Sequence, residues 1–157
     1  MNTTYTSLSP EETEHIGTQI GQNLRGGEVI ELVSDLGGGK TTLTKGIVAG
    51  AGSSDRVSSP TFTVSKEYAV PPQIDRTLVT ITHIDLYRLG EVGLMKHELA
   101  ELVADTTHAL IIEWADIAKS SLPKTRVTIS IIAIDESSRQ IIIECPDQLS
   151  YLLKDVR

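Results

Sequence analysis

The sequence predicts an α/β sandwich, a fold in which helices cover the faces of a β-sheet. Two observations indicate this fold class. An apolar run at residues 28–33 leads into a glycine-rich loop and a helical pattern, and two later apolar runs end in Asp85 and Glu113. Ligands of such sheets bind beyond the carboxyl ends of the strands. We therefore expect the loop and both acids at one edge of the sheet.

The first predicted element is a helix that begins near residue 10. Ser9 is a typical N-cap, Pro10 suits the first helical position, and Glu12 completes a capping box. Two glycines at 26–27 end the helix. Its apolar stripe, with one residue every four positions, consists of Ile16, Ile20 and Leu24.

A strand, a loop and a second helix follow. Residues 28–33 form the apolar strand, and residues 34–39 form the loop. A helix is predicted from Lys40 to Gly50, with Leu43, Ile47 and Val48 facing inward. Another strand is expected to begin at about Thr61 and to end before the two prolines at 71–72.

The second half of the chain predicts more strands. Residues 78–85 alternate as in a strand and are expected to pair with the strand after Thr61 as a hairpin. The apolar residues 109–112 are typical of a central parallel strand that is covered on both faces. The other predicted elements are a helix at 96–104, a second hairpin made of 126–135 and 139–145, and a short helix in the last ten residues.

Composition limits the classes of function. A length of 157 residues, with 39% apolar and 22% charged residues, predicts one globular domain, residues 1–157. The net charge of −7 argues against a nucleic-acid groove of its own, because such a groove needs clustered Lys and Arg. The single cysteine, Cys145, excludes an internal disulfide. Since the sequence has neither a spanning apolar stretch nor a signal-peptide core, we expect no membrane association and a cytoplasmic location.

The segment SDLGGGKTT, residues 34–42, predicts a phosphate-binding loop. Its glycines let consecutive backbone N–H groups curl around a phosphate, and the helix that follows presents its positive dipole end. The lysine supplies a mobile charge for the phosphates, and the next hydroxyl is a ligand for Mg²⁺. The residues expected to bind the nucleotide here are Gly37, Gly38, Gly39, Lys40, Thr41 and Thr42.

Position 34 departs from this motif, which has glycine at the strand exit. If that position requires a positive φ, serine costs about 1 kcal/mol, so Ser34 is the first position to inspect for strained backbone. Because it lies outside the glycines that wrap the phosphate, we expect the change to be tolerated. The alternative interpretation is a glycine-rich turn that precedes Gly-Lys-Thr by chance. The strand before the loop, the helix after it and the acids at two later strand ends favour a nucleotide site.

A triphosphate site also needs an acidic group for the metal or its water shell. Asp85 and Glu113 both qualify, although Asp85 would also cap a turn and Glu113 would also suit a surface ion pair. Thr61 follows Pro60 in a switch-like segment, where its hydroxyl would reach the γ-phosphate or the metal. A plain strand start is the alternative for Thr61, and spacing alone slightly favours it.

Four segments resemble, in order and spacing, those of the bacterial TsaE (YjeE) family. They are SDLGGGKTTLTKG, SSPTFTV, THIDLYRL and LIIEWAD, and the resemblance covers about residues 8 to 145. Family members are small P-loop ATPases that are weak alone and are required for threonylcarbamoyladenosine modification of tRNA. The resemblance implies a P-loop NTPase-like three-layer sandwich with a central mixed β-sheet, and ATP and Mg²⁺ as cofactors. Ser34 and Gly38 depart from the glycine and alanine that are usual in the family.

The resemblance also implies partners and residue roles. The partners are the TsaB–TsaD pair, through which alone the chain would reach tRNA, and an exposed patch at residues 85–89 would serve this contact. The implied roles are catalysis for Asp85, Glu113 and Thr61, metal binding for Thr41 and Glu113, and nucleotide contact for Pro10 and Arg139 besides the loop.

Three functions are compatible with the sequence. The first is an ATPase subunit of the tRNA-modification complex, which fits the acidic charge because the partner would carry the tRNA. The second is a small-molecule kinase on the same scaffold, although 157 residues leave little room for a lid or an acceptor domain. The third is a nucleotide-dependent binding module without useful turnover.

Overall fold

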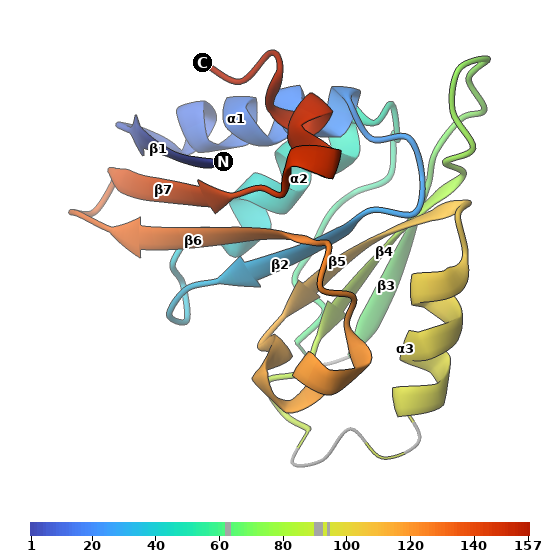
Figure 1. Ribbon diagram of the computed structural model, residues 1–157. Helices are drawn as coiled ribbons and strands as arrows, with labels where there is room; N and C mark the ends of the chain where they lie inside the picture. The colour runs from blue at the N-terminus through green and yellow to red at the C-terminus, as the bar shows by residue number, and fades with distance from the viewer. Residues whose placement is uncertain (62–63, 90–92, 94) are drawn as a thin grey trace.

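The computed structural model describes residues 1–61, 64–89, 93 and 95–157. Its centre is a mixed seven-stranded sheet of order β1-β7-β6-β2-β5-β4-β3, with helices on both faces (Figure 1). The strands are β1 (Asn2–Ser7), β2 (Val29–Val33), β3 (Ser65–Ala69), β4 (Thr80–Asp85), β5 (His108–Glu113), β6 (Val127–Ala133) and β7 (Arg139–Glu144). The helices are α1 (Pro10–Gln22), α2 (Lys40–Gly50), α3 (Met95–Ala104) and the 3₁₀ helices η1 (Ala115–Ser121) and η2 (Asp147–Leu153).

The middle of the sheet is parallel and its edges are antiparallel. Strand β5 pairs in parallel with both β2 and β4, and β2 pairs in parallel with β6. The two predicted hairpins, β3–β4 and β6–β7, are antiparallel. The α/β sandwich with a mixed sheet and the central position of the apolar strand are therefore confirmed.

Each face of the sheet has its own apolar core. One cluster joins the sheet to α1 and α2 and includes Ile20, Ile47 and Ile111. The other joins the sheet to α3 and η1 and includes Leu99, Leu110 and Ile112. Neighbouring residues of β5 thus enter opposite cores, as alternation along a strand covered on both faces requires.

The two helices on the first face begin and end close to the predicted positions. Ser9 caps α1 by accepting a hydrogen bond from Glu12 N at 3.2 Å. The Glu12 carboxylate returns to Leu8 N at 2.7 Å, one residue before the N–H of the usual capping box. Helix α2 runs from Lys40 to Gly50, as predicted.

Two differences from the sequence prediction concern strands. Strand β1 was not predicted, because its polar, alternating sequence NTTYTS lacks an apolar run; it pairs with β7 at the edge of the sheet. Strand β3 begins at Ser65 and not at about Thr61. Before it, Val64 has a φ of 66° and its N–H donates to Pro60 O at 2.7 Å. Residues 62–63 of the predicted strand lie outside the described residues.

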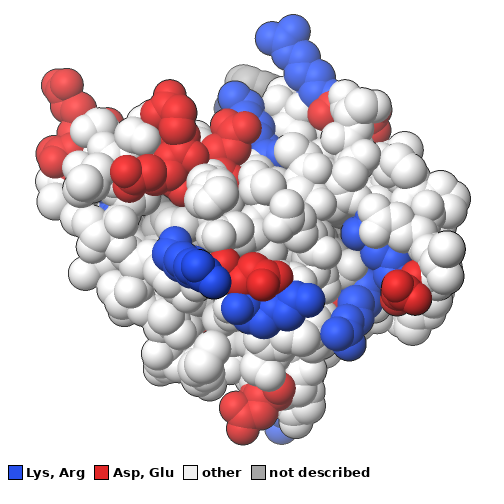
Figure 2. All heavy atoms as spheres, turned by 90° about the horizontal axis from the view of Figure 1, so that it is seen from above, with Lys and Arg blue, Asp and Glu red and all other residues white. Residues whose placement is uncertain are grey.

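Two further expectations concern the lack of a membrane span and the lack of a nucleic-acid groove. In the part of the chain that the structure describes, no helix combines the length and the apolarity needed to span a bilayer. On the face shown in Figure 2, Lys and Arg side chains form separate groups that are interrupted by acidic and uncharged residues. This face therefore presents no continuous basic tract.

Candidate functional site

Most of the predicted site residues meet at the carboxyl ends of β4 and β5. They surround a hollow of about 200 Å³ between these strand ends, the loop after β2 and the start of α2, whereas Pro10 and Arg139 lie outside this hollow. Residues of the switch-like segment before β3 complete its wall. The lining consists of Leu36, Gly37, Gly38, Gly39, Lys40, Thr41, Thr42, Ser59, Thr61, Asp85, Glu113 and Trp114.

The loop backbone has the shape of an anion cradle. Gly37 and Gly39 have φ angles of 74° and 113°, in the left-handed region where a side chain is strained. Gly39 is the N-cap of α2 and provides no side-chain cap. The first N–H groups of α2 consequently lack a capping side chain, and together with the helix dipole they favour an anion at this position.

Ser34 is not strained, as expected for a tolerated change at the strand exit. Among the described non-glycine residues, only Val64 and Trp114 have positive φ. The Ser34 hydroxyl donates to Asp35 O at 2.9 Å and accepts from Lys40 Nζ at 3.0 Å. Serine is therefore accommodated at the strand exit, where its hydroxyl takes part in the loop's own hydrogen bonds.

Lys40 lies buried between the loop and the acids. Besides the Ser34 hydroxyl, its ammonium group donates to Ser34 O at 3.2 Å and to Asp35 O at 3.0 Å. It also lies 4.0 Å from Glu113 Oε2 and 5.3 Å from the centroid of the Trp114 ring. The lysine charge is thus held at the mouth of the glycine loop, within reach of a carboxylate.

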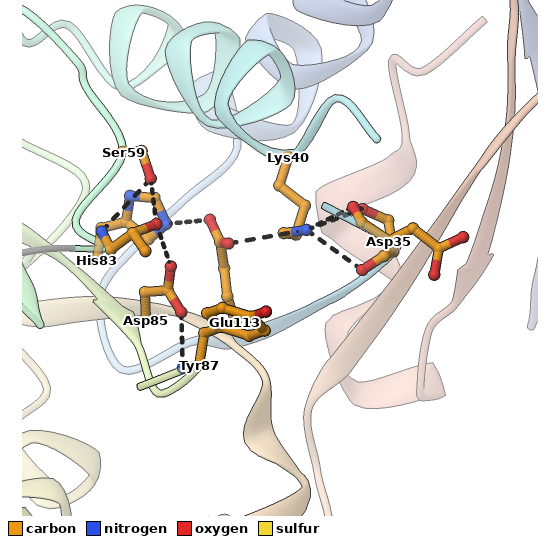
Figure 3. Close-up of polar contacts among 9 residues, drawn as sticks. Asp35, Lys40, Ser59, His83, Asp85, Tyr87 and Glu113 are labelled. Carbon is orange, nitrogen blue, oxygen red and sulfur yellow. Dashed lines mark hydrogen bonds and ion pairs between the residues drawn. The ribbon is translucent and has the colours of Figure 1, made fainter. Parts of the chain in front are cut away.

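Glu113 is buried and has two different partners. Its Oε1 lies 2.8 Å from His83 Nε2, and its Oε2 faces Lys40 (Figure 3). The surface ion pair considered for Glu113 is therefore wrong, because the side chain is only 3% exposed. The sequence interpretation gave His83 no site role because it lacks the clustering of metal ligands, although its spacing of two from Asp85 places both side chains on one face of β4.

Asp85 both caps a turn and faces the hollow. Its Oδ1 accepts from Tyr87 N at 2.9 Å, which is the turn cap considered from the sequence. Its Oδ2 accepts from the Thr61 hydroxyl at 2.7 Å, and that hydroxyl is also 2.7 Å from Ser59 Oγ. Thr61 thus belongs to the site wall, and the alternative of a plain strand start is wrong for it.

A buried tyrosine fixes the segment that carries Ser59 and Thr61. The Tyr68 hydroxyl donates to Ser58 O at 3.2 Å from within β3. Burial is the main cause that raises the pKa of Tyr68, so its hydroxyl remains a donor at neutral pH. The switch-like segment is therefore tied to the sheet just before it reaches the hollow.

Trp114 forms one side of the hollow in an unusual backbone conformation. It has φ 57° and ψ 43° and occupies the N-cap of η1. Its ring packs on Tyr87 with centroids 4.9 Å apart. The neighbouring patch at residues 85–89 is less exposed than expected, since Asp85 and Leu86 are buried while Tyr87 is 45% exposed.

Arg139 contacts the phosphate loop, whereas Pro10 does not line the hollow. Arg139 Nε donates to Gly38 O at 2.9 Å, and Nη1 donates to Asp135 O at 2.9 Å. Arg139 therefore supports the loop backbone. Pro10 begins α1 near this region, because Ser7 pairs with Arg139, but it is not among the residues that line the hollow.

The donor set suits a metal that is shared with a phosphate. Among the described residues, no cluster of three or more His, Cys, Asp or Glu side chains forms a metal cage. The hollow instead offers the Thr41 hydroxyl and the Glu113 and Asp85 carboxylates. Mg²⁺ is typically bound by one or two carboxylates together with substrate phosphates and waters, so these residues fit the expected metal.

Comparisons with known proteins agree on one family. The pattern of the family described as "Threonylcarbamoyl adenosine biosynthesis protein TsaE" matches residues 7–141. A relative from Bacillus subtilis, "tRNA threonylcarbamoyladenosine biosynthesis protein TsaE", is 33% identical over 86% of this chain and 80% of its own length. The protein of the same name from Treponema pallidum is 32% identical over 87% of this chain and 96% of its own length.

The fold is also similar to a solved structure. The crystal structure of YdiB from Bacillus subtilis superposes with a TM-score of 0.75 and 28% sequence identity. The match covers 99% of this chain and 94% of that chain. The likeness thus includes both the sheet and the segments that surround the hollow.

Proposed function

Because the chain belongs to the TsaE family of threonylcarbamoyl adenosine biosynthesis proteins, we propose that it is the ATP-binding and ATP-hydrolysing subunit of that pathway. One observation carries the proposal. The glycine loop and Lys40 meet Glu113 and Asp85 around a single hollow. A site that combines an anion cradle, a buried cation and carboxylates suits a nucleoside triphosphate with Mg²⁺ better than either a bare anion or a free metal.

Each side chain has a distinct task in this proposal. The N–H groups of Gly37 to Lys40 bind the phosphate oxygens, and the Lys40 ammonium adds a charge at the β- and γ-phosphates. Thr41 and Glu113 hold the metal side of the nucleotide. Bound Mg²⁺ supplies neutralisation of the charge that develops on the phosphates. Asp85, which already holds the Thr61 hydroxyl, orients the attacking water or the metal's water shell.

Two variants test the assignment of the two halves of the site. Lys40→Ala is expected to weaken ATP binding by about 100-fold or more, because charge-assisted hydrogen bonds are lost. Glu113→Ala is expected to lower kcat on the order of 100-fold while ATP binding changes little. Lys45→Ala, at an exposed position of α2, is the matched lysine control.

The measurements are phosphate release with Mg²⁺ and the fluorescence of Trp114, the single tryptophan, which lines the hollow. Wild-type rates of hydrolysis in both site variants would contradict the assignment. Binding without any hydrolysis in the wild-type chain, even with its partners, would indicate a nucleotide-dependent binding module.

The surface beside the loop supports a protein partner. Val33, Leu36 and Ile132 are apolar and 45%, 61% and 49% exposed. They line a second hollow, of about 680 Å³, which also includes Trp114. An apolar surface next to a nucleotide site suits a partner that responds to the nucleotide, which fits the TsaB–TsaD pair.

The partner proposal is tested with the cognate TsaB–TsaD pair. Addition of the pair is expected to stimulate hydrolysis by the full chain. Ile132→Asp is expected to weaken the stimulation while ATP binding stays unchanged, because a charge is placed in an apolar contact. Ile74→Asp is the control, since Ile74 is fully exposed in the β3–β4 loop at the opposite end of β4. Unchanged stimulation of the Ile132 variant would exclude this surface.

A further inference from the structure

Glu113 is held from one side by His83, a residue to which the proposed function gives no role. His83 is fully buried, and its Nε2 lies 2.8 Å from Glu113 Oε1. The two residues come from adjacent parallel strands, in which Asp85 stands beside Glu113 and His83 stands beside Ile111. Because side chains alternate along a strand, all four project from the same face of the sheet.

The direction of this hydrogen bond follows from the two groups. The Glu113 carboxylate can only accept, so His83 Nε2 carries the hydrogen and donates it. The other ring nitrogen, Nδ1, is buried and has no hydrogen-bond partner among the residues that the structure describes. A buried N–H group without an acceptor would be unfavourable there. The ring is therefore in the tautomer that carries its hydrogen on Nε2, and this N–H donates to Glu113.

The bond determines which way the carboxylate points. Oε1 is turned toward His83, and Oε2 lies 4.0 Å from Lys40 Nζ (Figure 3). Without the histidine, the long Glu113 side chain would have several rotamers available. The pairing of Oε1 with His83 thus leaves Oε2 as the oxygen that faces the loop.

We propose that His83 is a positioning residue of this site, which orients Glu113 so that Oε2 faces Lys40 and the glycine loop. The inference rests on the proposed function, because that function places Glu113 on the metal side of the nucleotide. Partners that orient a metal-binding carboxylate typically change metal affinity or activity about 10- to 100-fold when they are removed. An effect of this size is expected here.

The first test needs no nucleotide. Side-chain ¹⁵N NMR of the ligand-free chain at pH 8 is expected to show His83 as the Nε2–H tautomer. Glu113→Ala is expected to shift the Nε2 and Hε2 resonances, because the acceptor is lost. Observation of His83 as the Nδ1–H tautomer in the wild-type chain would overturn the proposal.

The second test compares two replacements of His83. His83→Leu removes the donor and keeps similar volume, whereas His83→Gln places an amide N–H donor at about the same reach. In the leucine variant, kcat is expected to fall about 10- to 100-fold, and the Mg²⁺ concentration for half-maximal hydrolysis is expected to rise by a similar factor. ATP affinity without Mg²⁺ is expected to stay within about threefold of wild type. Glutamine is expected to restore most of the activity.

His97→Leu is the matched control, because His97 is exposed on α3. Urea unfolding of every variant separates positioning from packing. The proposal would be overturned if both His83 variants lost the same share of kcat in proportion to their loss of stability. Wild-type hydrolysis by His83→Leu would overturn it as well. If Glu113→Ala is inactive and His83→Leu is active, the proposed function stands and the positioning role is wrong. If Lys40→Ala and Glu113→Ala both hydrolyse ATP like wild type, the proposed function itself fails.

Discussion

The side chain of Ser34 occupies the space into which a side chain at position 38 would project. A Cβ added to Gly38 would lie 2.4 Å from Ser34 Oγ and 2.8 Å from Ser34 Cβ. The third nearest atom is Asp35 O, at 3.0 Å. Gly38 does not have a positive φ, so an alanine there would be limited by space and not by backbone conformation. The serine at 34 therefore requires a glycine at 38.

This coupling predicts the outcome of a double-mutant cycle. Gly38→Ala is expected to lower the free energy of unfolding by about 1–3 kcal/mol in the wild-type chain, because the loop becomes overpacked. In a Ser34→Gly background, the same change is expected to cost less than half as much. Urea unfolding gives the four free energies, and the cycle isolates the pairwise contribution.

Gly37→Ala is the control for this cycle. Gly37 has a φ of 74° and no atom within 4 Å of an added Cβ, so its replacement is strained whatever stands at position 34. Its cost of about 1 kcal/mol should be the same in both backgrounds. An equal cost of Gly38→Ala in the two backgrounds would contradict the coupling.

Single residues also show what the sequence could predict about the site. Asp85 and Glu113 were predictable, because the ends of parallel strands meet at one edge and both acids stand at strand ends. The bond between His83 and Glu113 was not, since it depends on the register of two strands and on rotamers. The tolerated serine at position 34 was predictable, because it stands outside the glycines that wrap the phosphate, and its φ is one that serine can adopt.

Among the elements, α1 and α2 approach each other through four glycines. A Cβ on Gly17 would lie 2.3 Å from Leu43 O, and one on Gly46 would lie 1.9 Å from Glu14 O. Gly21 and Gly50 have similar contacts with Ile47 O and Thr18 O, at 2.0 and 2.1 Å. The glycines recur four residues apart on each helix, so that backbone packs against backbone. Helix α2, which begins directly after the phosphate loop, is thereby held against α1.

Gly46→Ala is therefore expected to destabilise the protein by at least about 2 kcal/mol. Alanine is the better helix former by about 0.8–1 kcal/mol, so intrinsic propensity predicts the opposite sign. The clash with the backbone of α1 outweighs it, because neither helix can move without disturbing the core. The urea midpoint measures the change. Lys45→Ala, one residue earlier and exposed, should stay within about 0.5 kcal/mol of wild type; a stabilised Gly46 variant would contradict the packing.

The predictions of secondary-structure elements were correct where local sequence signals are strong. The capping box, the helix after the glycine loop and the apolar run of β5 each identify an element without tertiary information. Strand β1 has no such signal, since it is a polar edge strand fixed by its pairing with β7. The start of β3 was placed too early because the turn at Val64 depends on the contact with Pro60, which spacing does not reveal.

At the scale of the whole molecule, the charge predicts that the isolated chain does not retain tRNA. The net charge is −7, and the surface seen in Figure 2 has no continuous basic tract. Phosphate contacts by Lys and Arg provide most non-specific affinity for nucleic acid. We expect a Kd for tRNA weaker than about 10⁻⁴ M at physiological salt, measured by fluorescence anisotropy. Micromolar binding by the chain alone would contradict the proposal that tRNA is reached through partners.

The single cysteine offers a measurement of global opening. Cys145 follows β7, is 2% exposed and belongs to the core cluster that joins the sheet to α1 and α2. Burial is the main cause that raises the pKa of its thiol, so both access and the thiolate fraction oppose reaction with a disulfide reagent. We expect labelling of the native chain to require unfolding. Ile47→Val, which removes a methyl group from the same core, should then speed labelling about two- to tenfold, because it costs about 0.5–1.5 kcal/mol.

The competing route to the thiol is local opening at the edge of the sheet. Cys145 N donates to Met1 O at 2.9 Å, so the start of β1 covers the end of β7. If fraying of β1 alone exposed the thiol, labelling would be insensitive to Ile47→Val and faster than global unfolding measured in urea. If the labelling rate equals the rate of global unfolding, and Ile47→Val changes both equally, the edge strand opens only with the whole sheet. The polar strand β1 would then be part of the cooperative fold that holds the loop and the acids together.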